Sequence, residues 1–261
     1  MHPCPNQSVV RQEGMSGLGI WYRYLVTSIE NGRRDKLYVS GFAEEPRYST
    51  QYGRNSRLSS RRWSFKFRTG LVARALSSLP SGALVADVGC ADGDYSAEIQ
   101  GMGYRCVGID RNPTRVLDGK RSHPGIEMIA ALATRLCVKS AAVDGIVVIN
   151  ALRYFEPRTD AISELHRILK PRGLLFILCH NATSPDVFLT PPRGAHYLTQ
   201  QAVASELATL GFEVAESGQN MVLPPLVPAQ AGPLLDHFSR TRLARTFSKV
   251  YPEFYLIAVK A

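Results

Sequence analysis

A glycine-rich loop near residue 90 is the first part of the sequence whose residue types suggest chemistry. It follows a short apolar segment and consists of Asp87-Val88-Gly89-Cys90-Ala91-Asp92-Gly93. Glycines at such a turn let the backbone approach a ligand closely, and a helix that starts after the loop presents unpaired N–H groups to a negative group. The spacing differs from the Gly-x-Gly-x-x-Gly of dinucleotide-binding proteins. The loop therefore predicts a nucleotide-like cofactor of another class.

A carboxylate ends the next apolar segment of the chain. Asp110 follows Arg105–Ile109 and lies 17 residues beyond Gly93, which is close to one strand-helix-strand step. A carboxylate at this place can accept hydrogen bonds from both hydroxyls of a ribose. Asp110 is therefore the candidate for binding the sugar of the cofactor.

The segments that must position these groups alternate between strand-like and helix-like patterns. Short apolar runs predict strands over residues 83–88, 105–109, 126–130, 145–149, 174–179, 212–217 and 254–259. Helical spacing and helix-end signals predict helices over residues 58–79, 95–101, 113–119, 159–169 and 199–210. Strands separated by helices predict an α/β fold with a mostly parallel, doubly wound sheet.

Two further stretches extend the pattern beyond the loop. They are Ala141–Ile149 (AAVDGIVVI) and Glu164–Leu175 (ELHRILKPRGLL). Together with the loop, Asp110 and the final segment Tyr255–Lys260, they resemble class I methyltransferases that use S-adenosyl-L-methionine, over about residues 81–261. The similarity is to the small-molecule branch typified by ubiquinone and menaquinone methyltransferases, with a type 11 domain. It implies a Rossmann-like, doubly wound sheet of seven strands, mostly parallel with an antiparallel last strand.

The resemblance also implies S-adenosyl-L-methionine as cofactor and a set of residues that bind it. Gly89 and its neighbours would line the methionine part, Asp110 would bind the ribose, and the backbone at Asn150 would contact the sulfonium end. The full set consists of Asp87, Gly89, Cys90, Ala91, Gly93, Asp110, Arg111, Leu132 and Asn150.

Three places depart from the family pattern, one of which is the usual Leu-Pro-Phe, replaced here by Leu136-Cys137-Val138. The middle glycine of the family loop is Ala91 here. Where the family often has an acid that bonds the adenine amine, this chain has Ala131-Leu132-Ala133. We therefore expect adenine recognition either through the backbone near Leu132 or not at all.

Candidates for acid–base chemistry are few. Methyl transfer needs mainly alignment of the acceptor, and it needs a base if the acceptor is a hydroxyl. His180 follows the fifth strand, at the edge where ligands bind, and is a candidate base or substrate contact; the alternative is a hydrogen-bonded loop histidine. Tyr154 either lines the acceptor pocket or packs as an aromatic side chain. No clustered carboxylates or histidines indicate a metal site.

The positive charge of the chain is concentrated near its start. Residues 1–80 hold 13 Lys and Arg against 5 Asp and Glu, whereas residues 81–261 hold 18 against 17. This excess indicates either an acidic partner, such as nucleic acid or an anionic membrane surface, or a solvated basic extension. Basic and aromatic residues also interleave between Arg61 and Arg68, which is compatible with single-stranded nucleic acid binding; we favour a helix that covers the cofactor.

The predicted domains are a basic N-terminal extension, 1–57, and a methyltransferase domain, 58–261. The methyltransferase domain includes a lid-like helix over residues 58–79 and a basic amphipathic insertion over residues 224–249. The insertion either rests on a membrane surface, caps a lipid-like acceptor or packs as a surface helix. The five cysteines form no CxxC pair, and the sequence has neither a secretory signal nor an apolar run long enough to span a bilayer. We therefore expect a cytoplasmic protein with reduced thiols.

The sequence leaves three functions open. The first is methyl transfer to a small-molecule acceptor, such as a secondary metabolite or a quinone-like, lipid-linked or saccharide compound. The second is RNA methylation, motivated by the basic N-terminal third, although Asn150-Ala151-Leu152-Arg153 lacks the Asn/Asp-Pro-Pro-aromatic motif of enzymes that methylate amino groups. The third is a non-catalytic binding protein that keeps the fold, motivated by the missing adenine acid.

Overall fold

The computed structural model describes residues 59–184, 198–220 and 252–261, with side chains from Trp63 onward, and the backbone of four short N-terminal strands. These strands form two antiparallel pairs: β1 (Gly14–Ser16) with β2 (Gly19–Trp21), and β3 (Tyr24–Glu30) with β4 (Arg33–Val39). The predicted insertion 224–249 lies outside the described residues.

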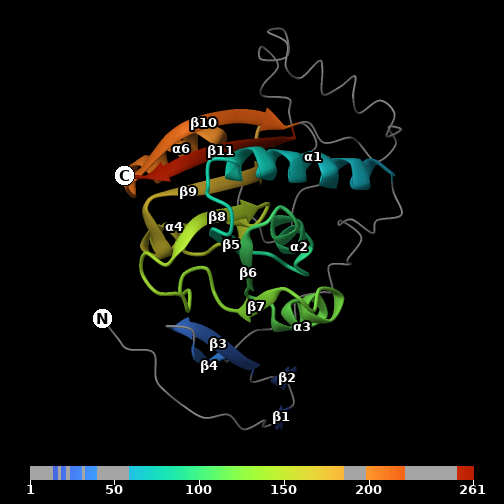
Figure 1. Ribbon diagram of the computed structural model, residues 1–261. Helices are drawn as coiled ribbons and strands as arrows, with labels where there is room; N and C mark the ends of the chain where they lie inside the picture. Colours follow the sequence, from blue (N-terminus) through green and yellow to red (C-terminus); the bar gives the residue numbers. More distant parts are fainter. Residues whose placement is uncertain are drawn as a thin grey trace.

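Seven strands form the central sheet, in the order β10-β11-β9-β8-β5-β6-β7 (Figure 1). They are β5 (Leu84–Val88), β6 (Arg105–Asp110), β7 (Glu127–Ala130), β8 (Val143–Ile149), β9 (Leu169–His180), β10 (Phe212–Asn220) and β11 (Glu253–Lys260). Strands β5 to β9 pair in parallel, and β11 runs antiparallel to both of its neighbours. The predicted mostly parallel sheet with an antiparallel last strand is confirmed.

Five helices and one short 3-10 turn flank these strands in the described parts of the chain. They are α1 (Ser59–Leu76), α2 (Asp94–Gly101), α3 (Pro113–Ser122), η1 (Leu152–Tyr154), α4 (Arg158–Ile168) and α6 (Gln200–Thr209). Local sequence explains several of their ends. Asn112 caps α3 and Thr199 caps α6 through side-chain oxygens that accept backbone N–H groups, and Gly211, at φ +84°, follows the end of α6.

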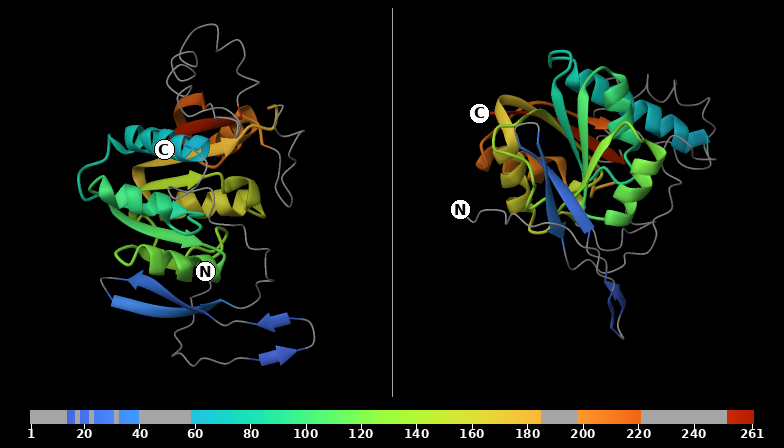
Figure 2. Two further views of the ribbon diagram at one scale, coloured as in Figure 1. Left: turned by 90° about the vertical axis from the view of Figure 1, so that its right-hand side faces the viewer. Right: turned by 60° about the horizontal axis from the view of Figure 1, so that its bottom comes forward.

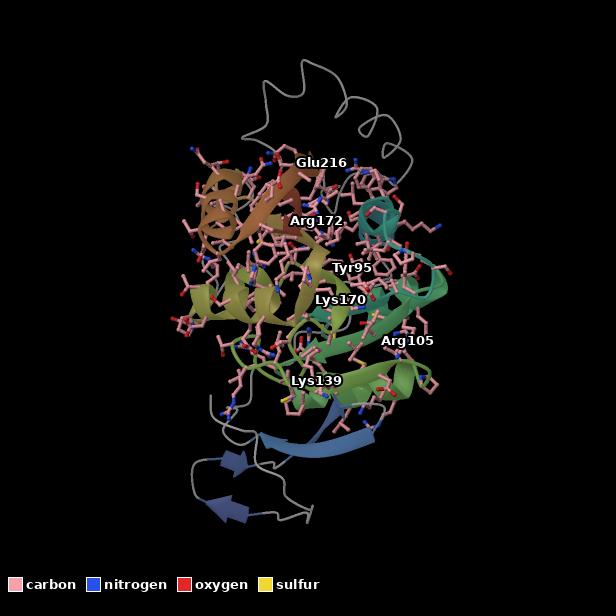
Figure 3. The ribbon with its side chains drawn as sticks, turned by 60° about the vertical axis from the view of Figure 1, so that its left-hand side comes forward. Tyr95, Arg105, Lys139, Lys170, Arg172 and Glu216 are labelled. Carbon is pink, nitrogen blue, oxygen red and sulfur yellow. The ribbon has the colours of Figure 1, made fainter. Side chains whose placement is uncertain are left out.

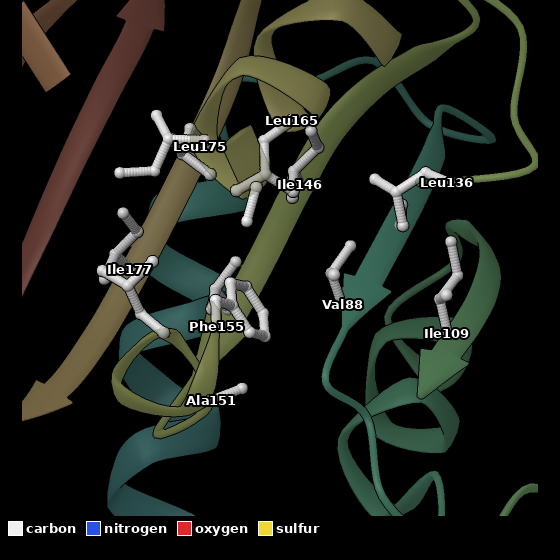
Figure 4. Close-up of a cluster of buried hydrophobic side chains, with 14 of the residues drawn as sticks. Val88, Ile109, Leu136, Ile146, Ala151, Phe155, Leu165, Leu175 and Ile177 are labelled. Carbon is white, nitrogen blue, oxygen red and sulfur yellow. The ribbon is translucent and has the colours of Figure 1, made fainter. Parts of the chain in front are cut away.

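The two faces of the sheet carry separate apolar cores. Figure 2 shows the helices that flank the sheet. On one face, Leu76 of α1 and Ile99 of α2 pack with strand residues such as Phe176. On the other, α4 and α6 pack against the sheet; Figure 4 shows Leu165 of α4 beside Ile146 of β8. Every side chain named here is fully buried, so the sheet is covered on both faces, as parallel sheets are.

The stretch ELHRILKPRGLL has a structural role. Glu164 accepts two hydrogen bonds from the Arg167 guanidinium, at 2.6 and 2.8 Å, and one from the backbone N–H of Leu136. Lys170 then lies 2.6 Å from Asp144 near the start of β8, and Arg172 adopts φ 62° within β9, where the register with β8 shifts (Figure 3). These charged groups tie α4 to the segment around Leu136 and β9 to β8.

The remaining structural predictions concern thiols and membranes. Cys90, Cys106, Cys137 and Cys179 are free thiols in the described part of the chain, and all but Cys137 are buried. The helices of that same part are too short or too polar to cross a membrane.

Candidate cofactor and acceptor site

The glycine-rich loop leaves β5 with a backbone that only small residues tolerate. Gly89, Ala91 and Gly93 all have positive φ, at 82°, 52° and 78°. A Cβ atom on Gly89 would lie 2.2 Å from the Cβ of Ala151, the residue that follows β8 by two positions. The loop is therefore pressed against the end of β8, and a side chain at Gly89 is excluded by both backbone conformation and space.

Asp110 holds the loop from the next strand. Its Oδ2 accepts the backbone N–H of Ala91 and its Oδ1 accepts that of Asn112, both at 2.8 Å. A carboxylate offers about four lone-pair positions, so each oxygen retains capacity for one further donor, such as a ribose hydroxyl. Burial raises the pKa of Asp110, and the two backbone donors work against this rise. These bonds hold the loop against the end of β6, and the predicted contact of Asp110 with ribose stays a prediction.

Asp87 and Cys90 are buried titratable residues of the loop. Asp87 is 2% exposed, and its Oδ2 accepts a hydrogen bond of 2.7 Å from Ser96 Oγ of α2. Burial raises its pKa from 3.8 to about 7. Burial also raises the pKa of the Cys90 thiol, which keeps it protonated. Both side chains thus fix the base of the loop in the structure, and any contact they make with cofactor stays a prediction.

The region predicted for adenine carries an apolar side chain. Leu132 follows β7 and is 41% exposed. The backbone N–H of Ala131 is taken by the carbonyl oxygen of Asp110, at 3.0 Å. An exposed leucine beside Asp110 suits the flat face of an adenine ring, and Arg111 lies exposed next to Asp110.

The other half of the site lies at the ends of β8 and β9. Asn150 follows β8 in a left-handed conformation, φ 54°, and its backbone N–H donates to the carbonyl oxygen of Leu178 at 2.7 Å. His180 ends β9, as predicted. Its Nε2 lies 3.9 Å from Oε1 of Glu253, the first residue of β11.

Glu253 was missed by the sequence reasoning. It is fully buried, and Arg68 of α1 binds it through two hydrogen bonds of 2.6 and 3.0 Å. Asn150 Nδ2 donates to its Oε1 at 2.8 Å, and Asn220 Nδ2 donates to its Oε2. Burial alone would raise the pKa of Glu253, but Arg68, His180 and the Asn150 amide lower it, so the carboxylate is ionised. The only sequence signal was an acid opening an apolar strand.

Tyr154 lies on η1, next to this region. The Arg153 guanidinium donates to its hydroxyl at 2.9 Å and sits 4.9 Å from the centre of its ring. The structure therefore gives Tyr154 a polar partner, and a contact with the acceptor stays a prediction. The described residues contain no group of three or more His, Cys, Asp or Glu side chains that could hold a metal ion.

Comparison with known proteins places this site in a family. Residues 86–177, which run from the loop to β9, match the methyltransferase domain family of type 11. The chain carries a class I S-adenosylmethionine-dependent methyltransferase domain. The cofactor of that class is S-adenosylmethionine, and the contact of its ribose with Asp110 stays a prediction.

The curated relatives of this domain differ in their acceptors. The chain is 30% identical to a demethylmenaquinone methyltransferase from Beutenbergia cavernae over 45% of each protein. It is 31% identical to a tRNA (carboxymethyluridine(34)-5-O)-methyltransferase from Arabidopsis thaliana over 49% of this chain and 32% of the relative. The match therefore spans less than half the length of both relatives.

Solved structures share the fold of the methyltransferase domain. The [4+2]-cyclase SpnF is 19% identical, with a TM-score of 0.61, over 80% of this chain and 86% of its own. A magnesium protoporphyrin IX methyltransferase from Synechocystis, solved with bound SAH, is 17% identical, with a TM-score of 0.56, over 78% of this chain and 86% of its own. A cyclase and a methyltransferase share this fold, so the activity must be argued from the site.

Proposed function

We propose that this protein transfers the methyl group of S-adenosylmethionine to a small-molecule acceptor. The observation that carries the proposal is the environment of Asp110, whose two carboxylate oxygens each accept one backbone N–H. The loop that Asp110 holds has positive φ at three positions. This arrangement supports a contact with ribose, because it holds the Asp110 carboxylate beside a loop that a ligand can approach closely.

The chain's own residues supply alignment. The bound cofactor would bring an activated methyl group. Asp110 would bind the ribose, and the exposed Leu132 would cover the adenine, in place of the acid common in the family. Asn150 and His180, at the ends of the adjacent strands β8 and β9, would face the acceptor. His180 would accept a proton from a hydroxyl acceptor.

A small acceptor agrees with the burial of the polar side chains at the ends of β10 and β11. Glu253 is fully buried, and Asn220 is only 1% exposed. Four of the curated relatives are demethylmenaquinone methyltransferases, which favours an acceptor of quinone-like character over other small molecules. Secondary metabolites, lipid-linked compounds and saccharides remain within the proposed class.

RNA is the second candidate acceptor. It is supported by the basic excess of residues 1–80 and by relatives that methylate a tRNA nucleoside. Gel-shift titration of total tRNA at two salt concentrations tests it, because phosphate contacts make affinity fall steeply with salt. Tight, salt-sensitive binding together with methyl transfer to tRNA would replace the small-molecule proposal.

Calorimetry with S-adenosylhomocysteine tests the cofactor site directly. We expect binding by the wild-type protein and a loss of more than about tenfold in Asp110→Ala, because the ribose loses its carboxylate partner. Asp118→Ala is the matched control, since Asp118 is an exposed acid of α3 that pairs with Arg121. Absence of binding by the wild type would instead indicate a binding protein that keeps only the fold.

A further inference from the structure

Four polar side chains form a line across the edge of the sheet where the cofactor loop lies. In the strand register, Asn220 of β10 stands opposite Glu253 of β11, which stands opposite His180 of β9. Directly opposite residues of antiparallel strands present their side chains on the same face. Asn150 continues the line at the end of β8. We call these four residues the polar row.

The polar row begins beside the cofactor loop. Gly89 of the loop is in contact distance of Ala151, which follows Asn150 directly. The row extends from there over β9, β11 and β10, away from β6 and Asp110. It therefore occupies the acceptor side of the proposed site.

Glu253 fixes the orientation of both asparagine amides. The carboxylate is ionised and can only accept hydrogen bonds, so each amide must turn its NH₂ group toward it. Arg68 already satisfies the charge of Glu253 with two hydrogen bonds. The carboxylate therefore fixes the orientation of each amide, with Nδ2 toward Glu253 and Oδ1 away from it.

The consequence is two buried carbonyl oxygens that point away from Glu253. Within the part of the chain that the structure describes, Asn150 Oδ1 and Asn220 Oδ1 receive no hydrogen bond. Buried acceptors without a donor are rare in folded proteins, and each favours a ligand that can donate. At these two oxygens a carboxylate ligand would meet like partial charge, and the Arg68 cation is engaged by Glu253.

We propose that Glu253 positions Asn150 and Asn220 as hydrogen-bond acceptors for the methyl acceptor, which therefore presents a hydroxyl or amine proton to the polar row. This inference rests on the proposed function and narrows its acceptor class. A carboxylate acceptor, such as the carboxymethyl group named for the tRNA-modifying relatives, is disfavoured.

The first test compares two small probes on the wild-type protein. Phenol donates a hydrogen bond, whereas benzoate only accepts. Side-chain amide signals in ¹⁵N-edited NMR spectra, assigned with Asn150→Asp and Asn220→Asp, report binding at the polar row. We expect phenol to shift these signals with an affinity at least about fivefold higher than benzoate. Equal or tighter benzoate binding, or no shift with phenol, overturns the proposal.

The second test removes the cause of the orientation. Glu253→Gln places both a hydrogen-bond donor and an acceptor at position 253, so that the amides of Asn150 and Asn220 can turn either way. The ratio of phenol affinity to benzoate affinity should then fall to about one. Glu216→Gln is the matched control, because Glu216 is an exposed acid of β10 that pairs with Arg74, another α1 arginine, at 2.7 Å. A preference that survives in Glu253→Gln contradicts the positioning role.

Calorimetry with S-adenosylhomocysteine separates this inference from the proposed function. Both probes are titrated into protein without cofactor, so their result does not depend on cofactor binding. Failure to bind S-adenosylhomocysteine defeats the methyltransferase proposal, whereas a preference for benzoate defeats only the assignment of the polar row.

Discussion

Asp87 should make the stability of this protein depend on pH, and Asp87→Asn should remove that dependence. The carboxyl group is buried, and its pKa is raised from 3.8 to about 7. Asparagine has nearly the same shape, and its carbonyl oxygen can still accept the hydrogen bond from Ser96 Oγ. The substitution therefore deletes one titrating group and leaves the packing of the loop in place.

The sign follows from proton binding. The folded protein binds the Asp87 proton more tightly than the unfolded chain, so this contribution to stability is fully present below the unfolded pKa of 3.8 and is lost as pH rises to about 7. Each unit of that interval corresponds to 1.36 kcal/mol. Between about pH 5 and about pH 8, the free energy of unfolding of the wild type should fall by about 2.5 kcal/mol more than that of Asp87→Asn.

Urea unfolding, followed by far-UV circular dichroism at these two pH values, measures the difference. Asp118→Asn is the control, because Asp118 is an exposed acid of α3 and should behave like the wild type. If the wild type and Asp87→Asn lose stability in parallel, Asp87 is already ionised in the folded protein near pH 5, and the argument from burial is wrong.

Three further predictions concern the loop and the candidate catalytic residues. Gly89→Ala should destabilise the protein by at least about 2 kcal/mol in thermal unfolding, because φ of Gly89 is +82° and the new Cβ would meet Ala151. The control is Gly101→Ala at the end of α2, where a Cβ has open space, and this variant should be as stable as the wild type or more stable. His180→Ala should lower the turnover number at least about tenfold and leave the affinity for S-adenosylhomocysteine unchanged. Tyr154→Phe should raise KM for the acceptor. Full activity of either variant in a methyl-transfer assay would show that the substituted residue does not belong to the acceptor site.

The sequence predicted the sheet well because its signals are local. Each strand of the parallel half contains a short apolar run, and Asn112 caps the α3 helix that follows β6. The stretch from Glu164 to Leu175 carried much of the family resemblance, yet Glu164, Arg167 and Lys170 bind backbone groups and Asp144. A pattern can therefore identify a fold through residues that position strands and perform no chemistry.

The polar row could not be predicted, because it depends on pairing between distant segments. Arg68 and Glu253 are 185 positions apart in the chain. In the sequence, Arg68 is one of several basic residues interleaved with aromatics, a pattern that suggested nucleic acid binding or a lid. The structure explains part of this pattern by packing: Phe65 is buried against Tyr95, with ring centres 4.7 Å apart, and Trp63 stacks on Phe67 at 5.1 Å.

The position of β11 has a consequence for the order in which the sheet can be assembled. β11 is the last of the seven strands along the chain, yet it lies between β9 and β10. During synthesis on the ribosome, β10 emerges first but has no strand to pair with until β11 follows, and β9 keeps an open edge in the meantime. Arrival of β11 closes that edge, joins β10 to the sheet and brings Glu253 to Arg68. The acceptor side of the site is thus the last part of the domain to form.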